Sequence, residues 1–255
     1  MVTWRWNDKQ YLRFEDERTR PAAELLARVP VATAARVVDL GCGPGNSTAL
    51  LRARWPQARL TGVDNSPEML ARARQDFPDL EWVAGDVATF RSAGPVDVYF
   101  ANAVLHWVPD HAALLPALVS QLRPGGALAV QMPDNADQPS HRLMREIAGP
   151  WLARTRAVGG RTRVESAAWY YDVLASGACH VDIWRATYEH VMPDAAAIVE
   201  WVEGSGLRPY LDALASDERA SYLAEYTRAI AAAYPERPDG KRLFSFPRLF
   251  MVAVR

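Results

Sequence analysis

Acidic side chains and glycines gather in one stretch near the start of the chain. Asp39 ends a β-branched run, and Gly41, Gly43 and Gly45 follow it at alternate positions. Glycine permits a positive φ and lets a ligand approach the backbone. With the polar run that begins at Asn46, the spacing predicts a strand, a tight turn and a helix, the unit that holds nucleotide-like ligands in open α/β sheets. A glycine turn without a ligand is the alternative.

The same turn argues against a dinucleotide. The fingerprint G-x-G-x-x-G would place its third glycine where this chain has Asn46. Asp39 would also face a pyrophosphate of like charge, which disfavours that ligand.

Two further acids are expected at strand ends. Asp64 closes the segment 59–64, where such folds bind a ribose diol, and one carboxylate accepts from two hydroxyls at once. Its alternative role is to cap the helix that starts at Pro67. Asp86 lies near the end of the segment 80–87, and a solvated loop acid is the alternative there.

Alternating strands and helices must position these acids. Apolar patterning predicts a doubly wound, mostly parallel α/β sheet. The expected strands are 37–40, 59–64, 80–87, 96–102, 127–132, 179–187 and 246–254. Helices are expected over 46–54, from Pro67, over 111–122, near 140–153 and around 169–172, the first with a small polar cap. Pro116 predicts a kink or a late start in the helix 111–122.

The chain divides into a core and helical additions. Residues 1–35 predict a helical arm over the sheet edge, and 194–236 have helical spacing interrupted by Gly204 and Gly206. We expect the arm and a ligand-binding core over 1–136, a helical substrate-side segment over 137–172, and the core again over 173–193. A small all-helical cap over 194–241 then precedes the last strand, 242–255.

Composition limits the function classes. The 255 residues are 49% hydrophobic with a net charge of −1, which predicts a globular protein whose overall charge does not favour nucleic acid or an anionic membrane; a local basic patch is the alternative. Two distant cysteines, Cys42 and Cys179, predict a reducing cytoplasm rather than a disulfide framework. Residues 1–10 predict no secretory signal, and no apolar run is long enough for a membrane span. The sequence has no metal-ligand spacing, nucleophile elbow or P-loop.

The motif Asp-x-Gly-x-Gly-x-Gly resembles the first motif of the class I S-adenosylmethionine-dependent methyltransferases. Longer stretches narrow this to the bacterial trans-aconitate 2-methyltransferases. Their resemblance is carried by Arg18–Ala22, Glu24–Pro30, Asp39–Leu51, Gln131–Asn135, Val181–Arg185, Gly206–Pro209 and Phe246–Phe250. It spans nearly the whole chain and is weakest between Trp151 and Ala168. The resemblance implies a Rossmann-like, seven-stranded sheet.

The resemblance also implies a reaction and its residues. S-adenosylmethionine would give its methyl group to one carboxylate of trans-aconitate, leaving S-adenosylhomocysteine and a monomethyl ester, without a metal. A carboxylic acid has a pKa near ~4, so the attacking oxygen is already ionised and needs no general base. The expected cofactor residues are Tyr11, Arg18, Asp39, Gly41, Gly43, Asp64, Asn65, Met69, Asp86, Val87 and Asn102. The expected substrate residues are Arg248, Arg208, Tyr171, Tyr188, His106 and Trp107, the last two positioning the reacting oxygen.

Two alternatives to this reaction remain open. One is a methyltransferase for another small acid or a phenolic metabolite. The other is a protein that binds S-adenosylmethionine without catalysis. A nicotinamide oxidoreductase is a remote third, opposed by Asn46.

Overall fold

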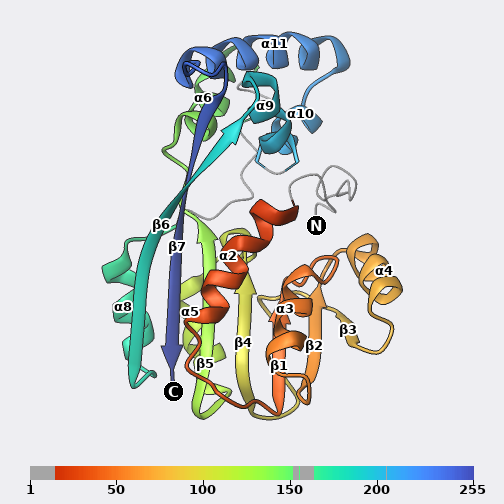
Figure 1. Ribbon diagram of the computed structural model, residues 1–255, viewed down its shortest axis with the longest axis vertical. Coiled ribbons are helices and arrows are strands. Elements are labelled where there is room, and N and C mark those ends of the chain that lie inside the picture. Colours follow the sequence, from red (N-terminus) through yellow and green to blue (C-terminus); the bar gives the residue numbers. More distant parts are fainter. Residues whose placement is uncertain (1–14, 152–154, 156–163, 205) are drawn as a thin grey trace.

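A computed structural model describes residues 15–151, 155, 164–204 and 206–255 of the chain (Figure 1). Seven strands form one sheet in the order β3-β2-β1-β4-β5-β7-β6. Neighbours among β1 to β5 run parallel, and β7 is antiparallel to both β5 and β6. The strands are β1 (Arg36–Leu40), β2 (Arg59–Asp64), β3 (Glu81–Ala84), β4 (Val96–Asn102), β5 (Leu122–Pro133), β6 (His180–Met192) and β7 (Arg242–Val254). The predicted Rossmann-like, mostly parallel seven-stranded sheet is confirmed.

Helices cover both faces of this sheet (Figure 1). The first half of the chain supplies α2 (Glu15–Ala27), α3 (Asn46–Arg54), α4 (Pro67–Asp76), the 3₁₀ turn η1 (Leu105–Trp107) and α5 (His111–Ser120). The second half supplies α6 (Pro139–Ile147), η2 (Gly149–Trp151), α8 (Ala167–Ala175), α9 (Ala195–Glu203), α10 (Arg208–Asp212) and α11 (Ser216–Ala233).

Alternating strand residues build two hydrophobic layers. Val37, Phe100 and Ala129 belong to the cluster that includes Leu25 of α2 and Leu51 of α3. Their strand neighbours belong to the cluster of α5 and α8 on the opposite face. The expected arm over the sheet edge is therefore wrong in its placement. Helix α2 packs on the face of the sheet, because its apolar stripe needs the area of several strands.

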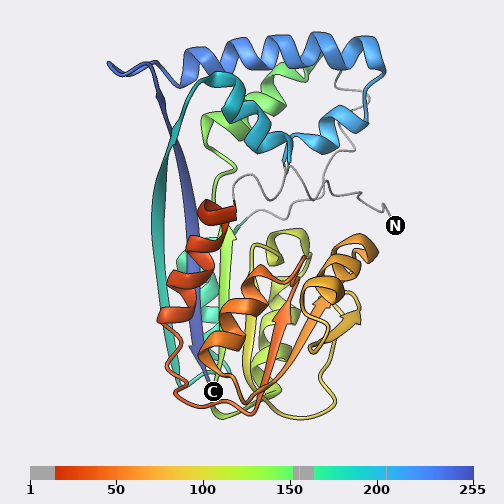
Figure 2. The same cartoon turned by 45° about the vertical axis from the view of Figure 1, so that its right-hand side comes forward.

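A long ribbon carries the cap. Strands β6 and β7 pair over 13 residues each and extend beyond the rest of the sheet to α6, α9, α10 and α11 (Figures 1 and 2). Phe244 and Phe246 of the ribbon join Trp201, Tyr222 and Tyr226 in the core of this cap. The predicted small helical cap before the last strand is confirmed.

Several predicted boundaries needed correction. The strand expected over 127–132 begins earlier, at Leu122, and its pairing with β4 shifts register between Val96 and Val98. Helix α5 begins at His111 after the capping residue Asp110, so Pro116 sits inside it rather than delaying its start. Strand β3 ends at Ala84, before Asp86. Strand β6 continues to Met192, beyond the predicted end at 187, and β7 begins at Arg242, before the predicted start at 246.

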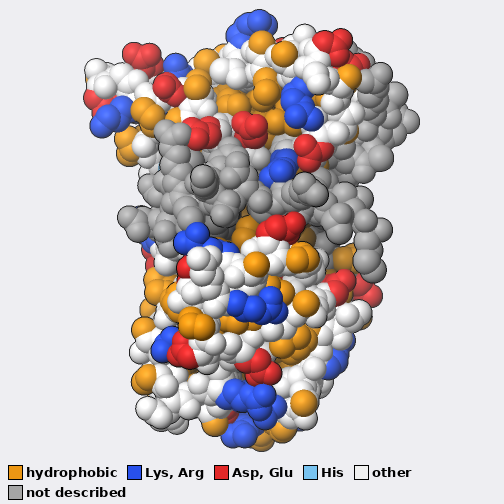
Figure 3. Space-filling model, turned by 90° about the vertical axis from the view of Figure 1, so that its right-hand side faces the viewer, with side chains coloured by type: hydrophobic (Ala, Val, Ile, Leu, Met, Phe, Trp, Pro, Cys, Tyr) orange, Lys and Arg blue, Asp and Glu red, His pale blue; other side chains and the backbone are white. Residues whose placement is uncertain are grey.

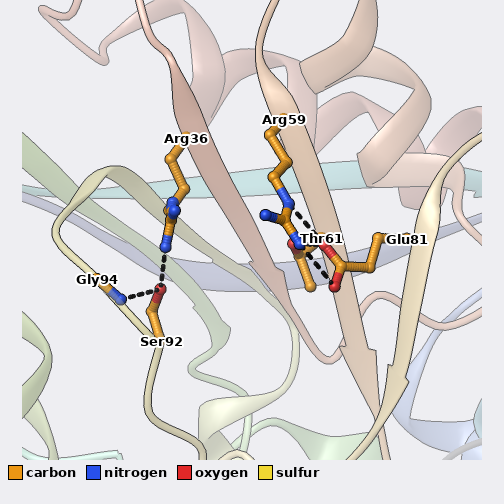
Figure 4. A network of polar contacts seen from close by, with 6 residues as sticks. All are labelled: Arg36, Arg59, Thr61, Glu81, Ser92 and Gly94. Atoms are coloured by element: carbon orange, nitrogen blue, oxygen red, sulfur yellow. Dashed lines mark hydrogen bonds and ion pairs between the residues drawn. The ribbon is translucent and has the colours of Figure 1, made fainter.

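Charged groups at the amino ends of the strands serve the fold. Arg59 at the start of β2 donates from Nε and Nη2 to the two carboxylate oxygens of Glu81, at 3.0 and 3.2 Å (Figure 4). Thr61 Oγ1 donates to the same side chain at 2.9 Å, and Arg36 Nη1 donates to Ser92 Oγ at 3.4 Å. The hydrogen bond from Arg59 lowers the pKa of Glu81. These contacts join neighbouring segments at the edge opposite the glycine turn, and the exposed ion pair of Arg59 with Glu81 contributes little stability by itself.

The described residues on the face drawn in Figure 3 form no continuous basic patch. Figure 3 shows basic and acidic side chains interspersed with hydrophobic ones over the described surface of one face. Within the described residues, no helix has both the length and the apolarity to cross a membrane. The same residues contain no group of three or more His, Cys, Asp or Glu side chains that could hold a metal ion.

Candidate active site

The glycine turn after β1 forms an open cradle. Gly41, Gly43 and Gly45 have φ values of +67°, +55° and +102°, a region that side chains other than glycine rarely adopt. A Cβ on Gly41 would lie 2.3 Å from the Val104 side chain, so the turn packs tightly there. A Cβ on Gly43 would meet no described atom within 4 Å. Among the described residues, nothing therefore fills the space beside Gly43, as a ligand cradle requires.

Asp39 lies buried beneath this turn with a relative exposure of 1%. Its Oδ2 accepts hydrogen bonds from Ser47 Oγ and Thr48 Oγ1, both at 2.6 Å. Its Oδ1 accepts none from the described residues. Burial raises the pKa of Asp39 to about 7, although the two hydroxyls oppose that shift. One oxygen is thus fixed by the start of α3, and the other can accept from a bound cationic or donor group.

The cap predicted for helix α3 was wrong. Gly45 occupies the N-cap position in a left-handed conformation and makes no side-chain cap. The hydroxyls of Ser47 and Thr48 bind Asp39 instead, because the glycine turn brings the first helical turn over the end of β1.

Asp64 extends the acidic edge to the next strand. Its Oδ2 accepts from Gly43 N at 2.9 Å and its Oδ1 from Ser66 N at 2.8 Å. Each carboxylate oxygen keeps a second lone pair for a diol. Burial raises the pKa of Asp64, while the backbone donors lower it. The helix-capping role belongs to Ser66, whose Oγ accepts from Met69 N.

The remaining predicted cofactor residues border the same strand ends. Asn65 is exposed and Met69 buried at the start of α4. Asp86 is exposed, with its Oδ1 accepting from Ala88 N at 2.9 Å, and Val87 next to it is buried. Their roles toward a cofactor stay predictions.

Polar side chains also lie near the carboxyl ends of β4 and β5 and at the middle of β7, which pairs there with the end of β5. Asn102 pairs in register with Gln131, which is fully buried. Arg248, 5% exposed, donates from Nη1 to Gln131 Oε1 at 3.2 Å. Its guanidinium also lies 4.8 Å from the ring of Phe246 and 5.9 Å from that of Tyr188. A buried cation therefore stands where the core meets the ribbon that leads to the cap.

The short turn η1 carries the predicted positioning residues. His106 is buried, and its ring centroid lies 5.0 Å from that of Trp107. Buried His111 contacts this turn through Nε2, 2.8 Å from the carbonyl oxygen of Leu105, and contacts the Tyr170 hydroxyl through Nδ1 at 2.8 Å. The carbonyl can only accept, so Nε2 carries the hydrogen, and in the neutral ring Nδ1 accepts from Tyr170.

Tyr188 joins the arm helix to the ribbon. Its hydroxyl donates to Glu24 Oε2 at 2.7 Å, and the Arg20 guanidinium lies 4.9 Å from its ring centroid. Burial and the neighbouring Glu24 raise its pKa. The ring of Tyr188 thus has the guanidinium groups of both Arg20 and Arg248 near it at this junction.

Other predicted residues are not brought to this place. Tyr171 on α8 is 52% exposed, whereas its neighbour Tyr170 is fully buried, and a substrate role for Tyr171 stays a prediction. Arg208 begins α10 in the cap and pairs with Asp212 at 3.7 Å. Tyr11 and the side chain of Arg18 lie outside the part of the chain that the structure describes.

Sequence reasoning missed four supporting groups. They are Ser47, Thr48, Gln131 and the His111–Tyr170 pair. Gln131 had a usable signal, since it is the one polar residue in the buried segment 126–133 of β5. The others depend on contacts between segments far apart in the sequence.

Known proteins resemble the whole chain. The sequence profile of the methyltransferase domain matches residues 37–126. The chain is 63% identical over 250 residues to the trans-aconitate 2-methyltransferase of Azoarcus sp. (strain BH72), covering 98% of this chain and 99% of that relative. It is 56% identical over 253 residues to the protein of the same name from Methylobacterium nodulans, covering 98% of each.

Solved structures share the fold at low identity. The YcgJ protein of Bacillus subtilis superposes with a TM-score of 0.60 at 13% identity, covering 92% of this chain and 98% of that one. Haemonchus contortus phosphoethanolamine N-methyltransferase 2 gives 0.56 at 15% identity, covering 92% and 52%. Because the sequence match to the bacterial relatives is high along nearly the entire chain, the protein belongs to the trans-aconitate 2-methyltransferase family of class I methyltransferases.

Proposed function

We propose that this protein transfers a methyl group from S-adenosylmethionine to a carboxylate of trans-aconitate, giving the monomethyl ester. The observation that carries the proposal is the 63% identity to a relative of that name over 98% of the chain, which includes the cap as well as the glycine turn. A small tricarboxylate is accordingly the partner, and nucleic acid is not. The two free cysteines support a reducing, cytoplasmic setting.

The residues at the strand ends fit the cofactor. Gly43 faces open space in the cradle, and Asp39 keeps one carboxylate oxygen without a described partner. Asp64 has the lone pairs for a ribose diol, and Asp86 with Val87 stands at the next strand end. When bound there, S-adenosylmethionine supplies an electrophilic methyl group on a sulfonium.

Catalysis by the chain's own residues rests on positioning. The substrate carboxylate is ionised at neutral pH, so the chain need not remove a proton. His106 and Trp107 on η1 orient the reacting oxygen, and the apolar ring faces near Arg248 exclude water. The helices of 194–241 form the substrate-side cap.

Buried Arg248 holds a non-reacting carboxylate of the substrate, and Arg208 of the cap is the second candidate. A guanidinium fork matches a carboxylate in geometry and charge. Burial at 5% exposure favours an anionic ligand for Arg248 over a phenol.

The test is methyl transfer from labelled S-adenosylmethionine to a panel containing trans-aconitate, cis-aconitate, citrate and a phenol. We expect the highest kcat/KM with trans-aconitate, and Arg248→Ala should raise the KM for it. Loss of one charge-assisted hydrogen bond costs roughly 1.5–3 kcal/mol, about 10- to 150-fold.

Arg208→Ala is assayed beside it, and Arg185→Ala is the control, since Arg185 is exposed and pairs with Asp134 at 2.8 Å. Unchanged KM values in both Arg248→Ala and Arg208→Ala would remove the proposed clamps. Faster transfer to the phenol than to any acid would contradict the function itself.

A further inference from the structure

Gln131 is a buried amide in a strand of apolar residues. Its relative exposure is 0%, and its strand neighbours Val130 and Met132 belong to the hydrophobic core of the α5 face. Successive strand residues point to opposite faces, so Gln131 shares the α2 face with Ala129. A buried amide costs free energy unless its donors and acceptors are used.

Chemistry fixes which way this amide is turned. Arg248 Nη1 lies 3.2 Å from Gln131 Oε1, and a guanidinium can only donate. The amide oxygen must therefore face Arg248, which turns the NH₂ group away from it. Gln131 Nε2 makes no hydrogen bond with the described residues. Leaving such a donor unused would cost about 1–3 kcal/mol.

The backbone joins Gln131 to the reaction site. Ala103 N donates to the Gln131 carbonyl oxygen at 2.9 Å, and Ala103 has a positive φ of 55°. The chain then passes directly to Val104, which packs against Gly41, and to η1 with His106. Gln131 consequently stands one strand away from the turn that bears the positioning residues, at the carboxyl end of the sheet.

Charge is divided across this face of the sheet. Asp39 and Asp64 lie at the carboxyl ends of β1 and β2. Gln131 lies on β5 and Arg248 on β7, and both strands come after β4 in the strand order. The environment of His190 is positive in the same way: burial, together with the charges of Arg248 and Arg20, lowers its pKa to about 4. The acidic half suits a cationic cofactor, and the donor half suits an anionic substrate.

We propose that Gln131 is a substrate-binding residue, whose Nε2–H donates a hydrogen bond to a carboxylate of the acid while Arg248 holds the amide in that orientation. The inference rests on the proposed function and extends it. The neutral amide of Gln131 and the cationic guanidinium of Arg248 then both donate hydrogen bonds to the acid. A ligand with one carboxylate can accept from one of these two donors at its best geometry, and a tricarboxylate can accept from both.

Gln131→Glu is the discriminating change. Glutamate has the same shape and keeps an oxygen for Arg248, but it replaces the Nε2–H donor with a second carboxylate oxygen. We expect the dissociation constant of trans-aconitate, measured by calorimetry with S-adenosylhomocysteine present, to rise at least tenfold. The KM for trans-aconitate should rise equally, with the KM for S-adenosylmethionine within twofold of the wild-type value.

Two further variants keep the test decisive. Gln131→Met removes the donor without adding charge and should also raise the dissociation constant of the acid at least tenfold. Gln75→Glu makes the same chemical change on the exposed side of α4 and should alter neither constant.

Each unexpected result of these assays leads to a different conclusion. Unchanged affinity for trans-aconitate in both Gln131 variants, with the wild-type enzyme active on that acid, would overturn this inference alone. A rise confined to the KM for S-adenosylmethionine would also overturn it, since the amide would then serve the cofactor. Wild-type protein without transfer to trans-aconitate would instead contradict the proposed function.

Discussion

Replacing Asp39 by asparagine should change how stability depends on pH. Its carboxyl is buried under the glycine turn, and its pKa is raised from the ordinary 3.8 to about 7. Below pH 3.8 the carboxyl is protonated in both folded and unfolded chains. Between pH 3.8 and 7 the unfolded chain loses this proton while the folded chain keeps it, so the free energy of unfolding falls as pH rises. Above pH 7 both forms are ionised and the loss is complete.

The size of the effect follows from that difference. About three pH units at 1.36 kcal/mol each give a loss of about 4 kcal/mol across the window. Asparagine keeps an oxygen for Ser47 and Thr48 but does not titrate. Its amide nitrogen would replace Oδ1, which has no described partner, at a constant cost of about 1–3 kcal/mol. Asp39→Asn should therefore be less stable than wild type at pH 4 and equally or more stable at pH 8.

Urea unfolding of the ligand-free protein at several pH values between 4 and 8.5 measures this difference. Asp239→Asn is the control, because Asp239 is exposed beside Lys241. Binding of the cationic cofactor should favour the ionised carboxylate. Calorimetry in two buffers of different ionisation enthalpy should then show release of up to about half a proton per site at pH 7 in wild type and less in Asp39→Asn. A pH-independent difference between the two proteins, together with no proton release, would refute the reasoning.

Two smaller sets of variants test the geometry of the site. Gly41→Ala should lose about 3 kcal/mol in urea unfolding, because its Cβ would overlap a branched side chain at a positive φ. Gly43→Ala should lose only about 1 kcal/mol but bind S-adenosylhomocysteine at least tenfold more weakly in calorimetry, and normal binding would remove Gly43 from the cofactor cradle. Tyr170→Phe should lose about 1–3 kcal/mol because the buried His111 nitrogen loses its donor, whereas Tyr171→Phe should change nothing. Equal stability of the two tyrosine variants would contradict the assigned contact.

The sequence predicted best where local pattern and structure coincide. The segments 59–64 and 96–102 became β2 and β4 with those bounds, since their apolar runs are bordered by polar residues. The lengths of strands β6 and β7 were underestimated at the end that carries the cap. His190 and Phe244 pair there, and both rings contact Trp201 of the cap. Pairing between strands so far apart in the sequence produces no periodic pattern of apolar residues in either strand.

In the candidate site, too, the sequence predicted some residues and not others. Spacing alone placed Asp39 and Asp64 at neighbouring strand ends, because parallel strands share one carboxyl edge. It could not show that two helix hydroxyls hold Asp39 or that Tyr170, not Tyr171, faces inward. A helix turns about 100° per residue, so one misassigned position exchanges a buried side chain for an exposed one.

We propose that a cationic methyl donor and an anionic acid meet at the carboxyl ends of β1, β2, β4 and β5, beside Arg248 of the antiparallel strand β7. The direct measurement is NMR of the product after the purified chain is mixed with trans-aconitate and S-adenosylmethionine carrying a ¹³C-labelled methyl group. We expect one new methyl-ester signal that grows with S-adenosylhomocysteine in equal amount. S-adenosylmethionine that stays intact, or a label that appears anywhere other than on a carboxylate oxygen, would contradict it.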